Sequence, residues 1–240
     1  MQCSPRIYIN IACMGNASEV LSGILNRIKE SGLDSAAQSL TLVVNGEEGF
    51  LSQDVIDLAQ SMSCEVRWGR GPLTTQVFEF PTLDLLQRES VSMPPDTPVL
   101  YMHTKGVSRN SSITVQDWTD MMLYFDVERW RDRLEELRDH DCTGVNFGGS
   151  RDDYEKDPRT WGYTSSPVCY SGNFWWSRAS HLARLPLPSS CPPDSNWGMW
   201  RMYSEMWLCQ LADASYHCCY HSGVNHYWVR HERHRYLIND

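Results

Sequence analysis

Hydrophobic and polar positions follow one another in blocks along the first hundred residues. Short apolar runs bounded by turn residues are typical of strands buried on both faces. Apolar residues spaced three or four apart indicate a helix with one buried side. The pattern predicts strands at 6–13, 40–44, 64–68 and 98–102, with helices between them at 17–31, 54–62 and 78–88.

The order of these segments predicts the class of fold. Strands that alternate with helices over short connections are typical of a mainly parallel central sheet with helices on both faces. A chain of 240 residues, 41% of them hydrophobic, is long enough to bury the core of one such domain. We therefore expect a single α/β domain over residues 1–240.

The second half of the chain has a less regular pattern. Residues 150–168, rich in Asp, Arg and Gly, form the longest irregular segment and are expected to act as a mobile lid. The predicted elements are a long amphipathic helix at 116–140, strands at 143–149 and 170–176, and helices at 177–185 and 200–208.

The fourth predicted strand ends abruptly in polar residues. His103, Thr104 and Lys105 follow it, and Gly106 permits a sharp turn of the backbone. In open α/β sheets, ligands bind beyond the carboxyl ends of such strands, so these side chains are candidates for a binding site. The plain alternative is an ordinary strand followed by a polar loop.

Two familiar nucleotide-binding motifs are absent from the sequence. No strand end carries a G-x-G-x-x-G fingerprint, and no G-x-x-x-x-G-K-[ST] phosphate loop occurs. We therefore exclude P-loop ATPase chemistry, and the missing glycines at the first strand end argue against an NAD-dependent enzyme. A nucleotide that meets the strand ends in another way remains compatible with the sequence.

Charge and cysteine usage restrict the partners and the compartment. The formal net charge is −9 and the pI is near 5.3, so no global basic field exists to hold nucleic acid, and an anionic ligand must be held by local groups. The nine cysteines are odd in number and irregularly spaced. With neither a signal-like N-terminus nor an apolar run of about 20 residues, we expect a cytoplasmic chain with reduced thiols and no transmembrane segment.

A local cluster of histidine and cysteine at 217–221 raises the question of zinc. It lacks the paired C-x-x-C spacing of structural zinc sites, and adjacent cysteines on a strand point to opposite faces. We do not expect a zinc site there.

The segment 170–176, Tyr-Ser-Gly-Asn-Phe-Trp-Trp, combines small, polar and aromatic residues. Ser171 and Asn173 offer hydrogen bonds to sugar hydroxyls, Gly172 permits close backbone approach, and Trp175 and Trp176 offer flat apolar walls. This combination predicts a sugar-binding segment. The alternative is a strand whose aromatic side chains simply alternate between two buried faces.

One carboxylate, Glu205, lies among aromatic and methionine residues in the predicted helix 200–208. A buried, unpaired carboxylate has a raised pKa, as a general base requires. The alternative is an ion pair with Arg201, one helical turn earlier.

Taken together, these segments resemble GT-A-type nucleotide-sugar glycosyltransferases, whose fold is Rossmann-like. The resemblance rests on the His-Thr-Lys-Gly strand end and the Ser-Gly-Asn-Phe-Trp-Trp motif, and it spans nearly the whole chain. Glycosyltransferases of large algal viruses and of microbial surface-glycan synthesis are similar at the level of the fold. The matching segments, in order, are 78–83, 100–108, 117–118, 144–146, 170–176 and 205–207.

The resemblance implies transfer of a hexosyl or deoxyhexosyl group from a nucleoside diphosphate sugar, a UDP-sugar by expectation, to a hydroxyl of a glycan. It implies a nucleotide-binding half at 1–106 and an acceptor half at 107–240, with Glu205 as the general base. The implied donor-binding residues are Ala12, Asn45, Trp68, His103, Thr104 and Lys105, and the implied acceptor-binding residues are Ser171, Gly172, Asn173, Trp175 and Trp176.

The metal requirement stays open at this point. Relatives carry an Asp-x-Asp pair that holds Mn²⁺ or Mg²⁺ on the diphosphate, whereas this chain has His103-Thr104-Lys105 at the equivalent place. Either His103 ligates the metal, joined by His221 or His226, or Lys105 supplies the positive charge directly.

Two other classes of protein remain under consideration. A nucleotidyltransferase shares the sheet but usually needs a glycine-rich loop after the first strand, where this chain offers only Gly15. A non-catalytic carbohydrate-binding or scaffolding domain would keep the tryptophans without bringing His103, Lys105 and Glu205 together. Whether those three side chains converge therefore distinguishes an enzyme from a binding module.

Overall fold

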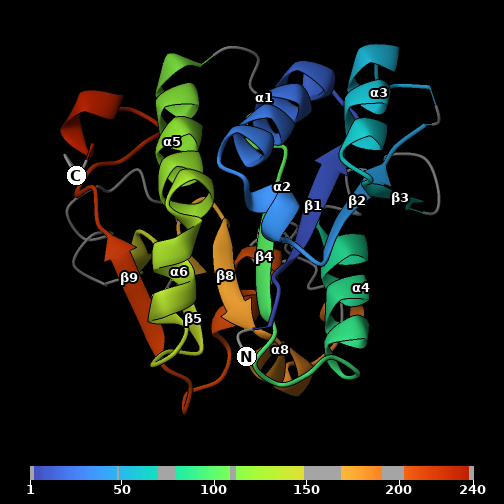
Figure 1. Cartoon of the computed structure of the whole chain (residues 1–240). Coiled ribbons are helices and arrows are strands. Elements are labelled where there is room, and N and C mark those ends of the chain that lie inside the picture. The colour runs from blue at the N-terminus through green and yellow to red at the C-terminus, as the bar shows by residue number, and fades with distance from the viewer. Residues whose placement is uncertain are drawn as a thin grey trace.

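A seven-stranded sheet forms the centre of the computed structural model, which describes residues 3–47, 49–69, 79–108, 112–148, 169–190 and 203–237. The strands of this sheet are β1 (Arg6–Ala12), β2 (Ser39–Asn45), β3 (Glu65–Trp68), β4 (Pro98–His103), β5 (Cys142–Val145), β8 (Trp175–Arg178) and β9 (Tyr216–Tyr220). Their order across the sheet is β3-β2-β1-β4-β8-β5-β9 (Figure 1). A separate two-stranded ladder joins β6 (Phe147–Gly148) to β7 (Cys169–Tyr170).

The first four strands are parallel, which confirms the predicted mainly parallel α/β class. In the register, Ala12 lies opposite Asn45 and Asn10 lies opposite His103, so the carboxyl ends of β1, β2 and β4 share one edge. β8 runs antiparallel between β4 and β5, and β9 pairs parallel with β5. One sheet thus runs through both predicted halves of the chain.

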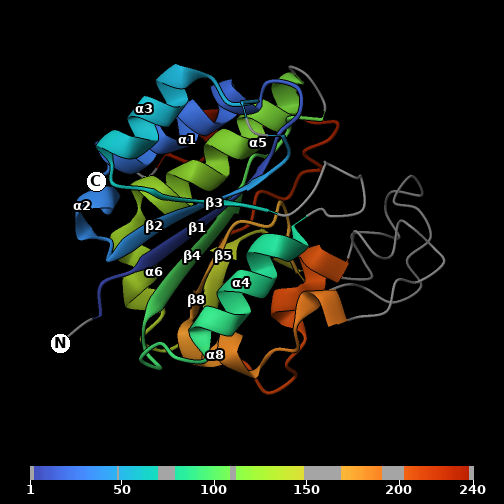
Figure 2. The same cartoon turned by 90° about the vertical axis from the view of Figure 1, so that its right-hand side faces the viewer.

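Helices cover both faces of this sheet, and Figure 2 shows the two layers edge on. On β1, Ile7 and Ile9 face one hydrophobic cluster and Tyr8 faces the other, because successive side chains of a strand point to opposite faces. The first cluster lies under α1 (Ala17–Glu30), α3 (Gln53–Ser61), α5 (Ile113–Leu123) and α6 (Trp130–Glu136), and the second under α4 (Phe80–Ser90) and α8 (Ala179–Arg184). A short helix, α2 (Leu33–Ala36), follows α1.

The helix predicted at 116–140 is in fact two helices joined by a π-helical turn, η1 (Tyr124–Glu128). The amide of Arg129 donates to the carbonyl of Tyr124, five residues earlier, at 2.9 Å. One residue more than an α-helical turn is accommodated there, which rotates the side chains that follow. This rotation explains why the apolar residues of 116–140 recur at mixed intervals of three, four and five residues.

The strand predicted at 170–176 is wrong as a single element. β7 ends at Tyr170 and β8 begins at Trp175, because Gly172 and Asn173 have φ of +99° and +57° and turn the chain between them. The strand predicted at 143–149 is interrupted in the same way at Asn146, whose φ is +49°. Hydrophobic pattern alone does not show where a backbone leaves the extended region.

The remaining predicted elements match the structure in part. The helix at 177–185 is confirmed as α8, and residues 203–206 are helical before a 3₁₀ turn, η3 (Trp207–Cys209). Two further 3₁₀ turns are η2 (Pro188–Ser190) and η4 (Arg233–Arg235). The predicted lid at 150–168 lies outside the described residues.

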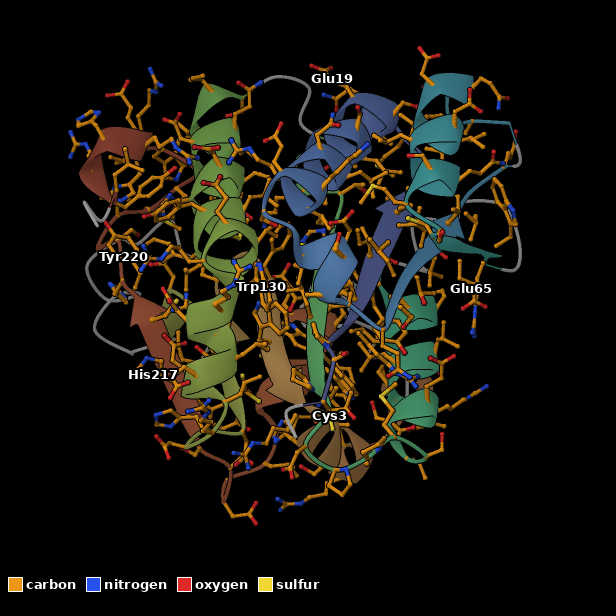
Figure 3. The ribbon with its side chains drawn as sticks, viewed as in Figure 1. Cys3, Glu19, Glu65, Trp130, His217 and Tyr220 are labelled. Atoms are coloured by element: carbon orange, nitrogen blue, oxygen red, sulfur yellow. The ribbon has the colours of Figure 1, made fainter. Side chains whose placement is uncertain are left out.

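The described cysteines are all free thiols. On β9, which carries His217 and Tyr220 (Figure 3), the neighbouring cysteines do not join a set of three metal-binding side chains within the described ranges. Within those same ranges, every helix is too short or too polar to cross a bilayer.

The π-helical turn places a carboxyl group, that of Asp126, in the core with no exposed surface. Within the described part of the chain, neither of its oxygens has a hydrogen-bond partner. The nearby Arg133 is committed elsewhere, since its guanidinium donates to both oxygens of Glu136 and to the carbonyl of Phe125. The pKa of Asp126 is raised to about 7, mainly by burial. The charge of Arg133 lowers this pKa and the charge of Glu136 raises it.

Asp126→Asn should make the stability of the folded protein less sensitive to rising pH. An exposed aspartate has a pKa of about 3.9, so the folded protein retains a proton that the unfolded chain releases between about pH 4 and pH 7. Stability from this group is therefore present at low pH and is lost as the pH rises towards 7, by roughly 4 kcal/mol at most. We expect Asp126→Asn to unfold at a higher temperature than wild type at pH 8, and this advantage to disappear at pH 4.

The control for this experiment is Asp139→Asn, which removes an exposed carboxylate near the end of the same helical segment. Thermal unfolding followed by circular dichroism from pH 4 to pH 8 measures all three proteins. A difference between Asp126→Asn and wild type that stays constant over this range would contradict the expectation.

Candidate functional site

The candidate site lies at the carboxyl edge of β1, β2 and β4, where the predicted donor-binding residues gather. Thr104 links two of the strand ends, because its hydroxyl accepts a hydrogen bond from the amide of Ala12 at 3.1 Å and its own amide donates to Asn10. Thr104 is buried. Gly106 then turns the chain with φ of +88°, as the sequence predicted.

Asn45 is a buried link between β2 and its neighbours. Its Nδ2 donates to Oδ1 of Asn10 at 2.6 Å, and the hydroxyl of Thr82 on α4 donates to the same oxygen at 2.7 Å. The Oδ1 atom of Asn45 is buried and has no hydrogen-bond partner in the described ranges. Trp68, at the end of β3, is 42% exposed and so presents its indole at the rim of the same edge.

His103 is anchored to the turn that follows β7. Its Nε2 lies 3.0 Å from the carbonyl oxygen of Gly172, and its ring meets Phe174 edge on. A carbonyl only accepts, so Nε2 carries the proton. Burial lowers the pKa of His103, the negative charge of Glu79 opposes this, and Lys105 lowers it further.

Lys105 is held over an aromatic ring. Its Nζ lies 3.9 Å from the ring centre of Trp118 on α5, within the range of a cation–π interaction. No described carboxylate forms an ion pair with this ammonium group. Its positive charge is thus positioned by the indole without being neutralised by a described side chain.

Beside this cation lies a pocket of about 220 Å³ between α1 and α5. Lys105 and Gly106 form part of its wall. The helices contribute mostly apolar and small residues, among them Val20, Gly23, Ile24 and Val115.

Glu79, immediately before α4, is a residue of this site that the sequence analysis did not single out. Its Oε2 accepts hydrogen bonds from the hydroxyl of Tyr101 at 2.5 Å and from Nδ2 of Asn173 at 2.6 Å. Its charge acts on both Tyr101 and His103. An acidic residue at the start of a helix, just after a loop from a strand end, was the signal for it in the sequence.

Glu205, the predicted general base, comes from a distant part of the chain and reaches the same cluster. It is half-buried in the helical turn at 203–206, and its negative charge raises the pKa of His103, which Lys105 lowers. Burial raises the pKa of Cys169 to about 12. Glu205 raises this pKa further and Lys105 lowers it. The charges of Lys105 and Glu205 thus both act on His103. Arg201, the alternative partner of Glu205, lies outside the described residues.

The predicted acceptor-binding motif proves to be mainly structural. Trp175 and Trp176 are at most 1% exposed, because β8 is an interior strand with helices on both sides. Trp175 stacks on Tyr101 with ring centres 4.9 Å apart, and Trp176 donates to the carbonyl of Asp126. The prediction that these two indoles bind the acceptor sugar is therefore wrong.

The turn between β7 and β8 explains the rest of that motif. Asn173 is buried, and besides donating to Glu79 it accepts a hydrogen bond from Nε1 of Trp175 at 2.9 Å. Gly172 is also buried against α5. Ser171 is half-buried, so it is the member of the predicted acceptor set whose side chain remains accessible.

The described residues do not assemble a metal site at this edge. No three side chains of His, Cys, Asp or Glu come together among them in a way that would hold a metal ion. His221 is exposed, and Nε2 of His226 already contacts Asn146 and Ser222. His103 remains the predicted metal ligand of this set, on its Nδ1 atom.

Comparison with known proteins adds little to this description. No family model matches the sequence, and no curated protein matches it. Among solved structures, 4-diphosphocytidyl-2C-methyl-D-erythritol synthase is similar with a TM-score of 0.41 and 13% sequence identity, over 89% of this chain and 87% of that one. A likeness this distant carries no information about the reaction.

Gly172→Ala should destabilise the fold more than an ordinary glycine substitution. A Cβ at this position would lie 2.4 Å from Sδ of Met122 and 3.1 Å from the indole of Trp118, at a φ that L-residues rarely adopt. Strain and overpacking each cost on the order of 1–3 kcal/mol. We expect the free energy of unfolding to fall by more than about 2 kcal/mol in urea titrations.

Gly223→Ala separates the two causes. Gly223 also has positive φ, +70°, but open space surrounds its Cβ position, so that variant should show the conformational cost alone. Equal losses in the two variants would show that the contact with Trp118 and Met122 does not matter.

Proposed function

We propose that this protein is a glycosyltransferase that moves a sugar from a nucleoside diphosphate sugar to a hydroxyl group of a glycan. The donor that we expect is a UDP-sugar. The observation that carries the proposal is the placement of His103, Thr104 and Lys105 at the carboxyl edge of the parallel strands, with Lys105 held over Trp118 and the charge of Glu205 acting on His103. Lys105 and Glu205 come from two distant segments, and a folded domain without a reaction to perform has no need to bring their charges to bear on one histidine.

The positive side of the site suits the leaving group. Breaking the bond between the sugar and a nucleoside diphosphate leaves negative charge on the phosphate oxygens, and a fixed cation stabilises that charge as it develops. Lys105, held over Trp118, is such a cation. In a chain with a net charge of −9, attraction of a diphosphate has to be local.

The negative side of the site suits the attacking group. An acceptor hydroxyl attacks the anomeric carbon more readily when a carboxylate takes its proton. Glu205 is assigned this role. Glu79 is oriented by two donors, Tyr101 and Asn173, and serves to fix the turn that anchors His103. Ser171, half-buried beside that turn, would contact the acceptor.

The nucleoside is assigned to the rim formed by the first three strands. The exposed indole of Trp68 offers a face to the base, while the buried Asn45 and the backbone of Ala12 shape the strand ends beneath it through their hydrogen bonds to Asn10 and Thr104. His103 and Thr104 then lie between the nucleoside and Lys105 and shape the path of the diphosphate.

The alternative of a non-catalytic carbohydrate-binding domain loses its main support. That hypothesis depended on tryptophan faces open to sugar rings, yet Trp175 and Trp176 are in the core. The charged cluster, by contrast, is what a transferase needs and a binding module does not.

Glu205→Gln should lower kcat for glycosyl transfer by about 10²- to 10⁴-fold with little change in KM, because the amide keeps the shape but takes no proton. Release of nucleoside diphosphate, measured with UDP-, GDP- and CDP-sugars and short oligosaccharide acceptors, reports the rate. Glu30→Gln, at the exposed end of α1, is the matched control and should behave as wild type. Wild-type turnover in Glu205→Gln would remove Glu205 from the mechanism, and no turnover of any donor by wild type would count against the proposal.

A matching nucleoside diphosphate should also raise the unfolding temperature. At a hundredfold excess over its dissociation constant, such a ligand adds about 2.7 kcal/mol to stability, or roughly 5–10 °C for a chain of this size. We expect UDP to give the largest shift among UDP, GDP, CDP and ADP. Trp68→Ala should reduce the shift if the indole stacks on the base, and a shift of zero with all four nucleotides would contradict nucleotide binding.

A further inference from the structure

The indole of Trp118 is the meeting point of several groups that the sequence keeps far apart. Lys105 lies over its ring, and the ring of His226 stacks on it with centres 5.1 Å apart and planes inclined by 11°. Gly172, whose carbonyl holds His103, packs against the Nε1 edge, where a Cβ would come within 3.1 Å. Trp118 therefore connects the candidate site to the C-terminal segment of the chain.

The hydrogen bonds of His226 identify which of its nitrogens carries the proton. The amide of Ser222 donates to Oδ1 of Asn146 at 2.8 Å, which fixes the orientation of that side-chain amide. Nδ2 of Asn146 must then be the donor to Nε2 of His226, 3.1 Å away. Because Nε2 accepts, a neutral ring has its proton on Nδ1. Burial lowers the pKa of His226 to about 4, and the charges of His231 and Lys105 act in the same direction, so the ring is neutral at physiological pH.

Two buried N–H groups around this stack have no acceptor among the described residues. They are Nε1 of Trp118, a residue 3% exposed, and Nδ1 of His226, a residue 4% exposed. Elsewhere in the core, the indole N–H groups of Trp130, Trp175, Trp176 and Trp207 each have a partner. A buried donor without a partner is unfavourable, and native proteins keep such groups where a ligand or an ordered water supplies the acceptor.

The chemistry of this set is that of an anion site. Lys105, Trp118 and His226 offer a charged ammonium and two N–H donors, and none of the free atoms is an acceptor. A divalent metal needs the opposite kind of group, lone pairs on oxygen, nitrogen or sulfur. The described residues at this edge do not provide three such ligands together. They therefore fit an oxyanion better than the metal that the family resemblance implies.

We propose that the diphosphate of the sugar donor binds directly to Lys105 Nζ, Trp118 Nε1–H and His226 Nδ1–H, without a divalent metal between protein and phosphate. This inference rests on the proposed function, since it names how that site takes its donor. It also assigns a task to the C-terminal segment around His226, which supplies one of the three donors. Trp118 acts twice, by its ring face on the lysine and by its N–H on a phosphate oxygen.

The test uses inorganic pyrophosphate as the probe and isothermal titration calorimetry on the full chain in the presence of EDTA. We expect wild type to bind pyrophosphate, and Lys105→Met to bind at least about tenfold more weakly because a charged hydrogen bond is lost. Trp118→Phe retains an aromatic ring but loses the N–H, and His226→Phe retains a stacking ring. Both should weaken binding by about five- to tenfold.

Matched controls are available on the same molecule. Lys29→Met removes an exposed lysine from the end of α1, and Trp130→Phe removes a buried indole N–H that is bound to the carbonyl of Ser31 (Figure 3). Both controls should bind pyrophosphate within about twofold of wild type, since neither touches the anion site. If Trp118→Phe folds poorly, the ¹H–¹⁵N spectrum of wild type replaces it, and the Trp118 indole signal should move on addition of pyrophosphate.

Three results would overturn the proposal. One is binding that appears only when Mn²⁺ or Mg²⁺ replaces EDTA. Another is binding in EDTA that Trp118→Phe and His226→Phe leave unchanged, which would mean that water satisfies these donors. The third is no binding of pyrophosphate under either condition.

The proposal and the proposed function fail in different ways. Pyrophosphate binding in EDTA that depends on all three residues, without turnover of any nucleotide sugar, would keep the anion site and remove the transferase. Glycosyl transfer that requires Mn²⁺, without pyrophosphate binding in EDTA, would keep the transferase and remove the metal-free site.

Discussion

The close approach of the Gly172–Asn173 turn to β4 and α5 is the constraint on which the candidate site depends. The carbonyl of Gly172 holds His103, the amide of Asn173 holds Glu79, and the missing Cβ of Gly172 gives Trp118 its place under Lys105. Both residues of the turn have positive φ, which glycine adopts freely and asparagine tolerates. The motif thus acts on the site through the backbone and through hydrogen bonds rather than through its tryptophans.

The burial of Trp175 and Trp176 gives this turn its rigidity. β8 lies between β4 and β5, so both faces of the strand are covered, and each indole also donates a hydrogen bond. Large aromatic side chains in this position resist displacement because their removal would leave cavities. The turn that precedes them is therefore held in one position. A site whose side chains are oriented by this turn requires such rigid support.

The first half of the fold was predictable because its information is local. Apolar runs such as 98–102 and the helical spacing in 17–31 identify buried strands and amphipathic helices without knowledge of their partners. The strand-end position of His103 and Lys105 followed from the same pattern. In the second half, the information lies in backbone conformation and long-range pairing. The positive φ of Asn146 and Asn173 and the antiparallel insertion of β8 leave no mark on hydrophobic periodicity.

The same limit explains which site residues were misjudged. Aromatic residues next to Gly and Asn have two equally good interpretations, a sugar platform or a core, and only the place of β8 inside the sheet decides between them. The place of Glu79 at the start of a helix was a weak signal, and its donors, Tyr101 and Asn173, lie too far along the chain for the sequence to connect them. Charge clusters assembled from residues about 20 to 130 positions apart become visible only after the chain has folded.

The candidate site contains charges of both signs, and each sign suits one side of the proposed reaction. Lys105 lies with Trp118 on the α5 side, while Glu79 and Glu205 oppose its influence on His103, and the histidine itself stays neutral because burial disfavours its charged form. A reaction in which negative charge grows on a leaving phosphate while a hydroxyl gives up a proton needs these two signs apart, so that neither neutralises the other before the substrate arrives. A neutral His103 fits this requirement, since it holds the Gly172 turn by a hydrogen bond without adding a charge to the site.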